Sequence, residues 1–431
     1  MADIRPFHGI RYTKKAGEIQ QLVCPPYDII SETERQAFLA ENPYNMIRLE
    51  LPIGDRPYRE AGETLAEWIQ NGLLHRDMDE GLYIYELEFF DQVEKGEKKR
   101  LKGLICLVHL EAFENNVVLP HEETLSKAKK DRFQLLEATK TNFSQIYSLY
   151  PDPKHLTRQR MDQLTEKQTP RYEFSDGLVT HRMWVVNDPV AIEAFRDDFV
   201  DRKLYIADGH HRYETALNYQ RHCRQEMLYT PGADCVMMFL ADMEDPGLVV
   251  FPTHRLVSGL ADFDPAQLLD RCRAYFSAET LKTPQEMAQR LDRERQSGNH
   301  AFGFYAGTDF HLLTLSDPAV MKSLLPHAGA DVRTLDVSIL HKLILESLLG
   351  IDGENLANQK NLSYTRDMGR AVADVQEGRC QCAFFLNPTG VSEIAAVAAN
   401  GEKMPQKSTY FYPKLTTGLV IRTMGGPDET N

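Results

Sequence analysis

Short apolar runs alternate with amphipathic stretches over residues 1–260. Residues 81–85 and 104–108 are apolar runs of strand length, which predicts buried strands. Between residues 61 and 70 the apolar side chains recur at helical spacing, and an Asn-Gly stop signal follows. This mixture of strands and helices predicts an α/β or α+β fold.

A further helix is predicted to begin after Asp188. Asp188 is a favoured N-cap residue, and Pro189 would occupy the first helical position. The apolar residues that follow recur at helical spacing, as expected for a helix with one buried face. The apolar run 204–207 then predicts a strand that leads directly into a polar segment and another helix.

The C-terminal part opens with charged, helix-rich sequence. The stretch 337–348 carries an apolar stripe and stops before Gly350, which predicts a buried helix with a glycine terminator. We expect residues 1–260 to form the catalytic region. Residues 261–424 are expected to form an α+β region that closes over the site, and residues 425–431 a disordered tail.

Composition narrows the possible partners. The chain has 63 acidic and 49 basic side chains and a net charge of -14, which disfavours a nucleic-acid partner. No stretch approaches the roughly 20 apolar residues that cross a bilayer, and the first residues lack the apolar core of a signal peptide. We therefore expect a cytoplasmic protein that binds small molecules and contacts no membrane.

The most informative segment is Asp208–Arg212, between the predicted strand and the next helix. A glycine turn at a helix start directs backbone N–H groups and the positive helix end toward one point, which suits an anion. His210, His211 and Arg212 add cationic donors, which are unfavourable there unless a negative ligand compensates them. Gly209 would let that ligand approach the backbone. The alternative is that Asp208 only caps the helix and the histidines are solvated.

A second segment begins at His121 and Glu122. These two side chains could supply a general base or a metal contact, while Lys127 or Arg132 touches phosphate. The alternative is ordinary helix capping, because acidic residues are common in the first turn of a helix. The spacing does not match the zinc-protease motif, since Leu125 stands where its second histidine would be.

Two further segments are candidates for substrate binding. Two prolines precede Tyr27 and Asp28, and they would hold these residues in a rigid turn, where Asp28 could bind an amine or magnesium. Near the C-terminus, Lys407, Ser408 and Thr409 mix charge with hydroxyl groups and could close over a ligand. A plain turn and an edge strand would give the same two patterns.

Several familiar nucleotide-site and catalytic motifs are missing from the sequence. It contains no Walker-A loop, no dinucleotide-binding glycine fingerprint, no kinase catalytic set and no nucleophile-elbow serine. Five other motifs occur in one order and together resemble the bacterial and archaeal family catalogued as domain of unknown function 1015, over essentially the whole chain. These motifs are Cys24–Asp28; Asn42–Pro43 with Asn45 and Arg48; His121–Glu122 and Thr124 with Lys130–Arg132; Asp208–Arg212; and Met404–Pro405 with Lys407–Thr409.

The Gly209–Arg212 turn is also similar to the phosphate-binding turn of the ParB and sulfiredoxin superfamily. This resemblance implies a ParB/sulfiredoxin-like catalytic core, with additional N-terminal α/β elements and a helical C-terminal layer. The superfamily includes free serine kinases, CTP-binding ParB proteins and sulfiredoxin, which repairs a sulfinic acid with ATP. Sulfiredoxin's essential cysteine is absent, because His210 and His211 fill the middle of the turn.

Three hypotheses follow. The first is a small-molecule kinase that uses ATP or ADP with Mg²⁺, acts on a hydroxylated metabolite such as free L-serine, and takes Glu122, His121 or Asp208 as its base. The second is a nucleotide-sensing or ParB-like regulatory protein that binds without transfer. The third is a metal-dependent hydrolase built on these three residues together with His210 and His211.

Overall fold

The computed structural model describes residues 1–91, 96–124, 126–358 and 360–425, without the side chains of residues 126, 127 and 357. The chain divides into two compact units. Unit 1 comprises Met1–Pro120, Thr124–Val249 and Pro413–Asn431, and unit 2 comprises His121–Glu123 and Val250–Tyr412. Residues 426–431 of the predicted tail lie outside the described residues.

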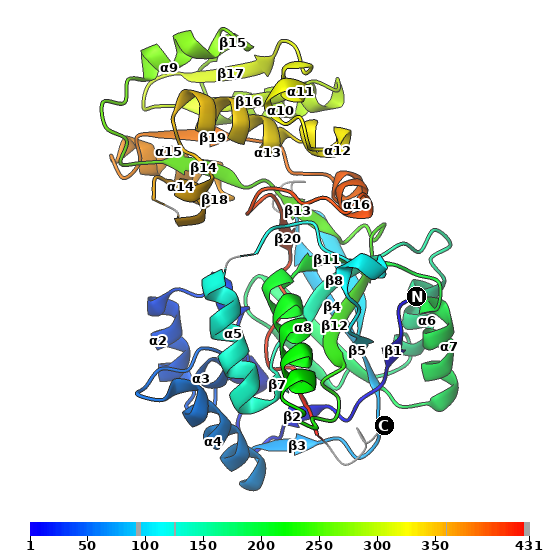
Figure 1. Ribbon diagram of the computed structural model, residues 1–431. Coiled ribbons are helices and arrows are strands. Elements are labelled where there is room, and N and C mark those ends of the chain that lie inside the picture. The colour runs from blue at the N-terminus through cyan, green and yellow to red at the C-terminus, as the bar shows by residue number, and fades with distance from the viewer. Residues whose placement is uncertain (92–95, 125, 359, 426–431) are drawn as a thin grey trace. The chain divides into compact units, whose positions relative to one another are not determined.

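Unit 1 is built on a mixed sheet that has nine strands among the described residues (Figure 1). The strand order is β6-β11-β8-β12-β5-β4-β10-β9, and β1 also pairs with β5. Strands β4 and β5 pair antiparallel, whereas β12 runs parallel to β8, so the sheet is mixed. The strands are β1 (Ile4–Arg5), β4 (Leu82–Phe90), β5 (Lys98–His109), β6 (Val118–Leu119), β8 (Ile146–Tyr150), β9 (Tyr172–Ser175), β10 (Val179–Val186), β11 (Leu204–Asp208) and β12 (Cys235–Asp242).

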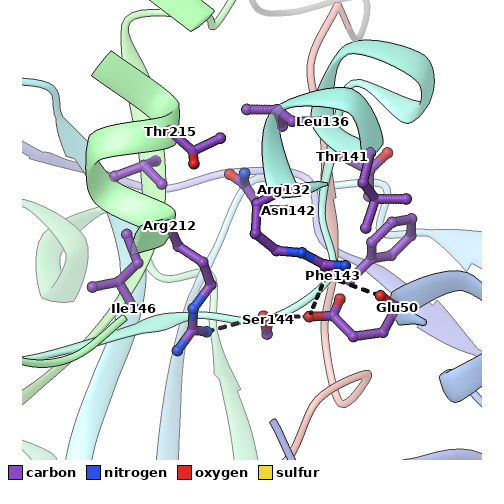
Figure 2. A pocket seen from close by; sticks show the side chains of 12 residues that line it. Glu50, Arg132, Leu136, Thr141, Asn142, Phe143, Ser144, Ile146, Arg212 and Thr215 are labelled. Carbon is purple, nitrogen blue, oxygen red and sulfur yellow. Dashed lines mark hydrogen bonds and ion pairs between the residues drawn. The ribbon is translucent and has the colours of Figure 1, made fainter. Parts of the chain in front are cut away.

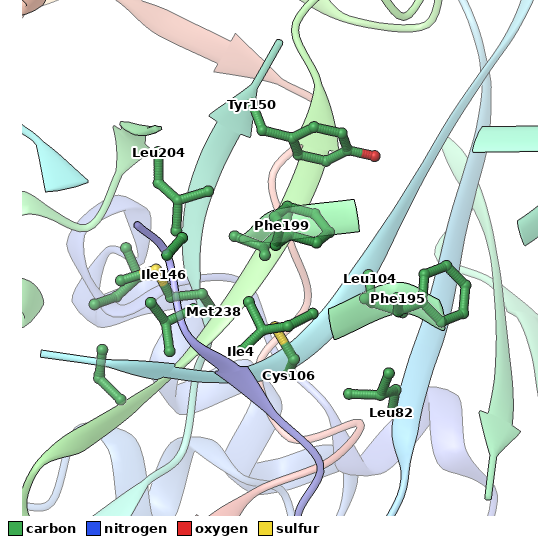
Figure 3. Close-up of a cluster of buried hydrophobic side chains, with 14 of the residues drawn as sticks. Ile4, Leu82, Leu104, Cys106, Ile146, Tyr150, Phe195, Phe199, Leu204 and Met238 are labelled. Carbon is green, nitrogen blue, oxygen red and sulfur yellow. The ribbon is translucent and has the colours of Figure 1, made fainter. Parts of the chain in front are cut away.

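The main core of unit 1 covers one face of this sheet. Alternate residues of each strand, such as Leu104 and Cys106 of β5, point into it, as the two-residue period of a strand requires. Phe195 and Phe199 of α7 pack on these strands (Figure 3). The predicted cap of α7 is confirmed, because the Asp188 carboxylate accepts from two backbone N–H groups in the first turn.

Further helices surround a second core of unit 1. Helix α5 packs against α4 and α8, and Leu65 and Trp68 form the buried stripe of α4. Short pairs β2 with β3 and β7 with β21 complete the unit. The remaining elements are β2 (Ile10–Tyr12), α1 (Ile19–Leu22), η1 (Tyr27–Ile29), α2 (Glu32–Glu41), α3 (Ile47–Glu50), α4 (Pro57–Gln70), β3 (Leu74–Arg76), η2 (Phe113–Asn115), α5 (Ser126–Thr139), β7 (Thr141–Asn142), α6 (Leu156–Thr165), α7 (Pro189–Phe199), α8 (His210–Gln225) and β21 (Arg422–Thr423).

Unit 2 contains a six-stranded sheet in the order β15-β17-β16-β19-β14-β18. Both faces are covered, because Phe302 and Phe304 of β16 enter one core and the alternating Ala301 and Tyr305 enter the other. Strands β13 and β20 form a separate pair. The elements are β13 (Val249–Phe251), β14 (His254–Val257), α9 (Pro265–Cys272), β15 (Phe276–Leu281), α10 (Pro284–Gln296), β16 (Ala301–Tyr305), β17 (Phe310–Leu315), α11 (Val320–Leu324), α12 (Ala330–Arg333), α13 (Asp336–Ile339), η3 (Leu340–Leu348), α14 (Gly353–Asn358), β18 (Leu362–Thr365), α15 (Met368–Gln376), β19 (Cys382–Phe385), α16 (Val391–Ala399) and β20 (Tyr410–Tyr412).

The predicted apolar helix over residues 337–348 is partly different in the structure. It begins as α13 and continues as the π-helical segment η3, which buries His341 beside Leu340 and Ile344. Gly350 ends it with a φ of 70°, as the sequence predicted. A spacing of apolar residues does not distinguish α-helical from π-helical turns, so the sequence could not show this wider turn.

The mixed α/β class predicted from the sequence is confirmed. The predicted boundary at residue 260 lies beyond the observed division at Val249, because β14 pairs with β18 and β19 inside unit 2. A strand's pattern does not reveal which sheet it joins. Among the described residues, no helix is both long enough and apolar enough to cross a membrane.

Candidate functional site

The polar turn of unit 1 lies where β11 ends and α8 begins. Gly209 is the N-cap residue of α8 and has a φ of 97°, a conformation that strongly favours glycine. A Cβ atom at this position would lie 2.9 Å from Nη2 of Arg212. The space beside Gly209 is therefore filled by the Arg212 guanidinium, whereas the sequence suggested that a ligand would approach there.

Two cations hold the carboxylate of Asp208. Lys414 Nζ donates to Asp208 Oδ1 at 2.6 Å, and Arg212 Nη2 donates to Asp208 Oδ2 at 2.9 Å. Only 13% of the Lys414 side chain and 12% of the Arg212 side chain are exposed. Two positive charges and one negative charge thus meet at the positive end of α8. An anionic ligand is favoured at such a helix start.

Arg212 makes further contacts within unit 1. Its Nη1 donates to Ser144 Oγ at 2.9 Å and to the carbonyl oxygen of Gln145 at 2.7 Å. Among the described residues, its buried Nε has no hydrogen-bond partner. Both terminal nitrogens are therefore engaged by the protein, and the predicted contact of Arg212 with phosphate stays a prediction.

A second buried arginine lies close to this turn. Arg132 Nη1 donates to the carbonyl oxygen of Glu50 at 2.9 Å and lies 3.5 Å from Glu50 Oε1, and the guanidinium also pairs with Asp131. Its guanidinium carbon lies 4.3 Å from the ring centre of Tyr27. Burial and Asp28 raise the pKa of Tyr27, and both Arg212 and Arg132 oppose this rise. The Tyr27 ring is thus near two cations.

A small cavity of about 50 Å³ lies beside these residues (Figure 2). Glu50, Arg132, Ser144 and Arg212 line it, together with Thr215 of α8, whose buried hydroxyl has no hydrogen-bond partner in the described part of the chain. Ligand sites for nucleotides are several times larger. The cavity therefore accommodates no more than a few atoms.

The two histidines of the turn differ in exposure. His210 and His211 form the start of α8, and His210 is buried whereas His211 is partly exposed. Asp28 is exposed on η1, next to Tyr27. The side chain of Lys127, a predicted phosphate ligand, lies outside the described part of the chain.

The remaining predicted residues come together in unit 2. His121 Nε2 lies 3.1 Å from Thr409 Oγ1, and Glu122 Oε1 accepts from the backbone N–H of Lys407 at 2.8 Å. Ser408 is buried and its hydroxyl donates to the carbonyl oxygen of Pro405. The capping role considered for Glu122 is wrong, because α5 begins only at Ser126 and has no acidic residue in its first turn.

Lys407 has an unusual backbone conformation. Its φ is 56°, which costs free energy for a residue other than glycine. Both sides of the residue are fixed, since its N–H binds Glu122 and its carbonyl oxygen accepts from Arg255 Nη2 at 3.2 Å. The segment Met404–Thr409 is therefore held by residues far away in the sequence.

Arg255 lies in β14 and is almost completely buried. Its Nε donates to His341 Nε2 at 3.3 Å, and its guanidinium carbon lies 5.1 Å from the ring centre of Tyr364. Burial lowers the pKa of Arg255 to about 10, although Tyr364 and Glu122 oppose this change. Burial and the charge of Arg255 lower the pKa of His254 to about 4.

The predicted site residues thus fall into two groups. Unit 1 holds Tyr27, Asp28, Arg132 and Asp208–Arg212, and unit 2 holds His121, Glu122 and Lys407–Thr409. Sequence reasoning missed Glu50 and Ser144, because a single polar residue carries no local signal of its partner.

A metal site needs several ligating side chains close together. Within the described residues, no group of three or more His, Cys, Asp and Glu side chains could hold a metal ion. Both oxygens of Asp208 accept from cations, so this carboxylate does not fit a magnesium ligand in its present contacts. The described residues therefore provide no set of metal ligands for the metal-dependent hydrolase of the third hypothesis.

The fold and this site define a mixed α/β protein whose strand-to-helix turn gathers buried cations. A family model described as "Protein of unknown function (DUF1015)" matches residues 4–338. The chain therefore belongs to this family, as its five motifs predicted. No curated protein matches the chain.

Three of the solved structures that match share little sequence with this chain. A conserved hypothetical protein from Pyrococcus furiosus is 14% identical, with coverage of 73% of this chain and 95% of that chain and a TM-score of 0.36. A free serine kinase in complex with AMP is 13% identical, with coverage of 73% and 92% and a TM-score of 0.37. SbnI from Staphylococcus aureus, with a C-terminal truncation, is 13% identical, with coverage of 73% and 85% and a TM-score of 0.36.

Proposed function

We propose that this chain is a nucleotide-dependent phosphotransferase that acts on a small hydroxylated metabolite, with ATP or ADP as the donor. One observation carries the proposal: Lys414 and Arg212, both mostly buried, hold a single carboxylate between them at the positive end of α8. A phosphate group would be stabilised by these two cations and by the helix dipole together. Phosphoryl transfer depends mainly on such charge neutralisation and on positioning.

Lys414 is the cation that we expect to release Asp208 and bind the donor phosphates. Its ammonium is one flexible point charge, whereas Arg212 is fixed by Ser144 and Gln145 as well. The acceptor hydroxyl then needs one base. Asp208 is the candidate for that base within unit 1, and free L-serine is one candidate acceptor.

The experiment begins with the purified chain, ATP or ADP, Mg²⁺ and a panel of hydroxylated amino acids and metabolites. A phosphorylated acceptor, detected by mass spectrometry, is the expected product. Lys414→Met should weaken nucleotide binding about tenfold to hundredfold, because it removes a charged hydrogen-bond donor. Lys167→Met is the matched control, since Lys167 is exposed in unit 1, and it should leave binding unchanged. Absence of nucleotide binding in the unmodified chain would refute the proposal.

A second candidate function is a nucleotide sensor that does not catalyse transfer. The observation that favours it is the full engagement of Asp208 by two cations, which leaves this carboxylate poorly suited to act as a base. Such a sensor would gain thermal stability with nucleotide but form no product with any acceptor. A phosphorylated acceptor formed in the same assay would favour the enzyme instead.

A further inference from the structure

A chain of hydrogen bonds passes through the interior of unit 1 and ends at the candidate phosphate site. Ser144 is its central member, in the segment between β7 and β8. Its hydroxyl accepts from Arg212 Nη1 at 2.9 Å and donates to Glu50 Oε1 at 3.3 Å. Glu50 in turn binds Arg132, and Arg212 binds Asp208. Residues from four separate stretches of the chain are therefore coupled.

The direction of each bond in this chain is determined by chemistry. Ionised Glu50 can only accept and Arg212 can only donate, so the single proton of the Ser144 hydroxyl must point to Glu50. The oxygen of Ser144 then presents its lone pairs to Arg212. Glu50 is 3% exposed and Ser144 is 9% exposed, so water competes little for these groups. Figure 2 shows Glu50, Ser144 and Arg212 side by side along this path.

We propose that Glu50 and Ser144 are positioning residues, which fix the orientation of the Arg212 guanidinium and thereby the affinity of the Asp208 turn for a phosphate-bearing ligand. The ligand part of this inference rests on the proposed function, and the orientation part rests on the geometry. With Nη1 held by Ser144 and Gln145, Arg212 presents Nη2 to Asp208 and holds Asp208 opposite Lys414. Without Ser144, one of these restraints is lost.

Unit 1 contains a second relay of the same kind that serves as a matched control. The hydroxyl of Thr157 accepts from Arg202 Nη1 at 2.6 Å and donates to Asp198 Oδ2 at 3.2 Å. Thr157 is fully buried, and Ser144 is only 9% exposed. The Thr157 relay joins helices α6 and α7 and shares no residue with the Asp208 turn. Loss of this hydroxyl removes the same type of interaction at a different place.

The first test compares Ser144→Ala, Ser144→Thr and Thr157→Ala by calorimetric titration with ADP. Ser144→Ala should weaken ADP binding about threefold to tenfold, as expected for one lost hydrogen bond, and Ser144→Thr should restore most of the affinity. Thr157→Ala should lower the melting temperature about as much as Ser144→Ala and leave ADP binding unchanged. Equal ADP affinity in Ser144→Ala and in the unmodified chain would overturn the proposal.

A second readout separates this inference from the proposed function. In ¹⁵N-arginine NMR spectra, the Arg212 signal is assigned by its loss in Arg212→Lys, and its guanidinium should rotate slowly. Ser144→Ala should accelerate that rotation, whereas Thr157→Ala should accelerate only the rotation of Arg202. If the chain binds no ADP, the proposed function fails, and this measurement alone decides the positioning role. An unchanged rate of Arg212 rotation in Ser144→Ala would refute the positioning role of Ser144.

Discussion

A histidine precedes an arginine at His211–Arg212 in unit 1 and at His254–Arg255 in unit 2, and these two arginines have different partners. In unit 1, Arg212 follows His211 at the start of a helix and forms an ion pair with Asp208 at 2.9 Å. In unit 2, Arg255 follows His254 within β14, and no carboxylate in the described residues lies within ion-pair distance of it. Its hydrogen bonds go to His341 and to backbone carbonyl groups.

This difference shows two ways to bury a guanidinium group. In unit 1 the Asp208 carboxylate lies between Arg212 and Lys414 and accepts from both. Arg255 has no carboxylate within ion-pair distance among the described residues, although the more distant Glu122 still acts on its pKa. Burial and Arg255 lower the pKa of His341 well below its usual value, and this histidine stays neutral and accepts a hydrogen bond. The first arrangement places two cations at a helix start, whereas the second fixes the Met404–Thr409 segment through the Lys407 carbonyl group.

The largest expected effect comes from removing one partner of a buried ion pair. Arg132→Met leaves Glu50 buried without its cation and should lower the free energy of unfolding by about 3 to 5 kcal/mol. Arg255→Met leaves no carboxylate behind and should cost less, about 1 to 3 kcal/mol for unpaired backbone acceptors. Chemical denaturation of both variants measures the difference. A larger loss in Arg255→Met would contradict the comparison.

Acidification should weaken unit 2 through its buried histidines. The folded-state pKa of His254 falls from 6.5 to about 4, so the unfolded chain binds more protons between these values. Stability is then lost as the pH falls from 6.5 toward 4, by about 3 kcal/mol at about 1.4 kcal/mol per pKa unit. Hydrogen exchange of β14 peptides is the suitable measurement, because both tryptophans, Trp68 and Trp184, lie in unit 1. His254→Asn should flatten this dependence.

Unit 1 should contain a group with the opposite slope. Burial raises the pKa of Asp245 to about 6 from 3.8, although Arg158 opposes this change. The contribution of Asp245 to stability is therefore present at low pH and lost as the pH rises from about 4 through 6. Asp245→Asn should remove this trend from the exchange of β12 peptides. The same trend in Asp245→Asn and in the unmodified chain would assign it to other groups.

Glycine substitutions test how Arg212 depends on its turn. Gly209→Ala meets both an unfavourable φ and the Arg212 guanidinium at 2.9 Å. Gly378→Ala in unit 2 meets only the φ of 74°, with no atom within 4 Å of the added carbon. We expect Gly378→Ala to cost about 1 to 2 kcal/mol and Gly209→Ala to cost more. Only Gly209→Ala should also weaken nucleotide binding, and equal effects would show that Arg212 moves aside freely.

The smallest expected change is a gain in stability. Lys407→Gly relieves a positive φ and should stabilise the chain by about 0.5 to 1 kcal/mol, after the entropy of glycine is deducted. Lys140→Gly is the matched control, since Lys140 is also exposed and has a φ of 49°. Both variants should melt at a higher temperature. If Lys407 contacts an anionic ligand, only Lys407→Gly should weaken its binding.

The local sequence determined the features that depend on neighbouring residues. Asp188 followed by proline predicted the cap of α7, and the apolar run before Asp208 predicted β11. The conformation of Gly209 also followed from its place between a strand and a helix. These features need no distant contact, because backbone propensity and side-chain periodicity act over a few residues. The five family motifs were recognisable for the same reason.

The tertiary structure alone decided which charges meet. Asp208 contacts Lys414, Ser144 joins Glu50 to Arg212, and Glu122 binds the backbone of Lys407, although each pair is far apart in the sequence. It also decided that β14 joins the sheet of unit 2, where Arg255 is buried beside His341 and Tyr364. An isolated glutamate or serine has the same local pattern whether its partner is water or an arginine. Its chemistry is therefore set only when folding excludes the water and places the partner beside it.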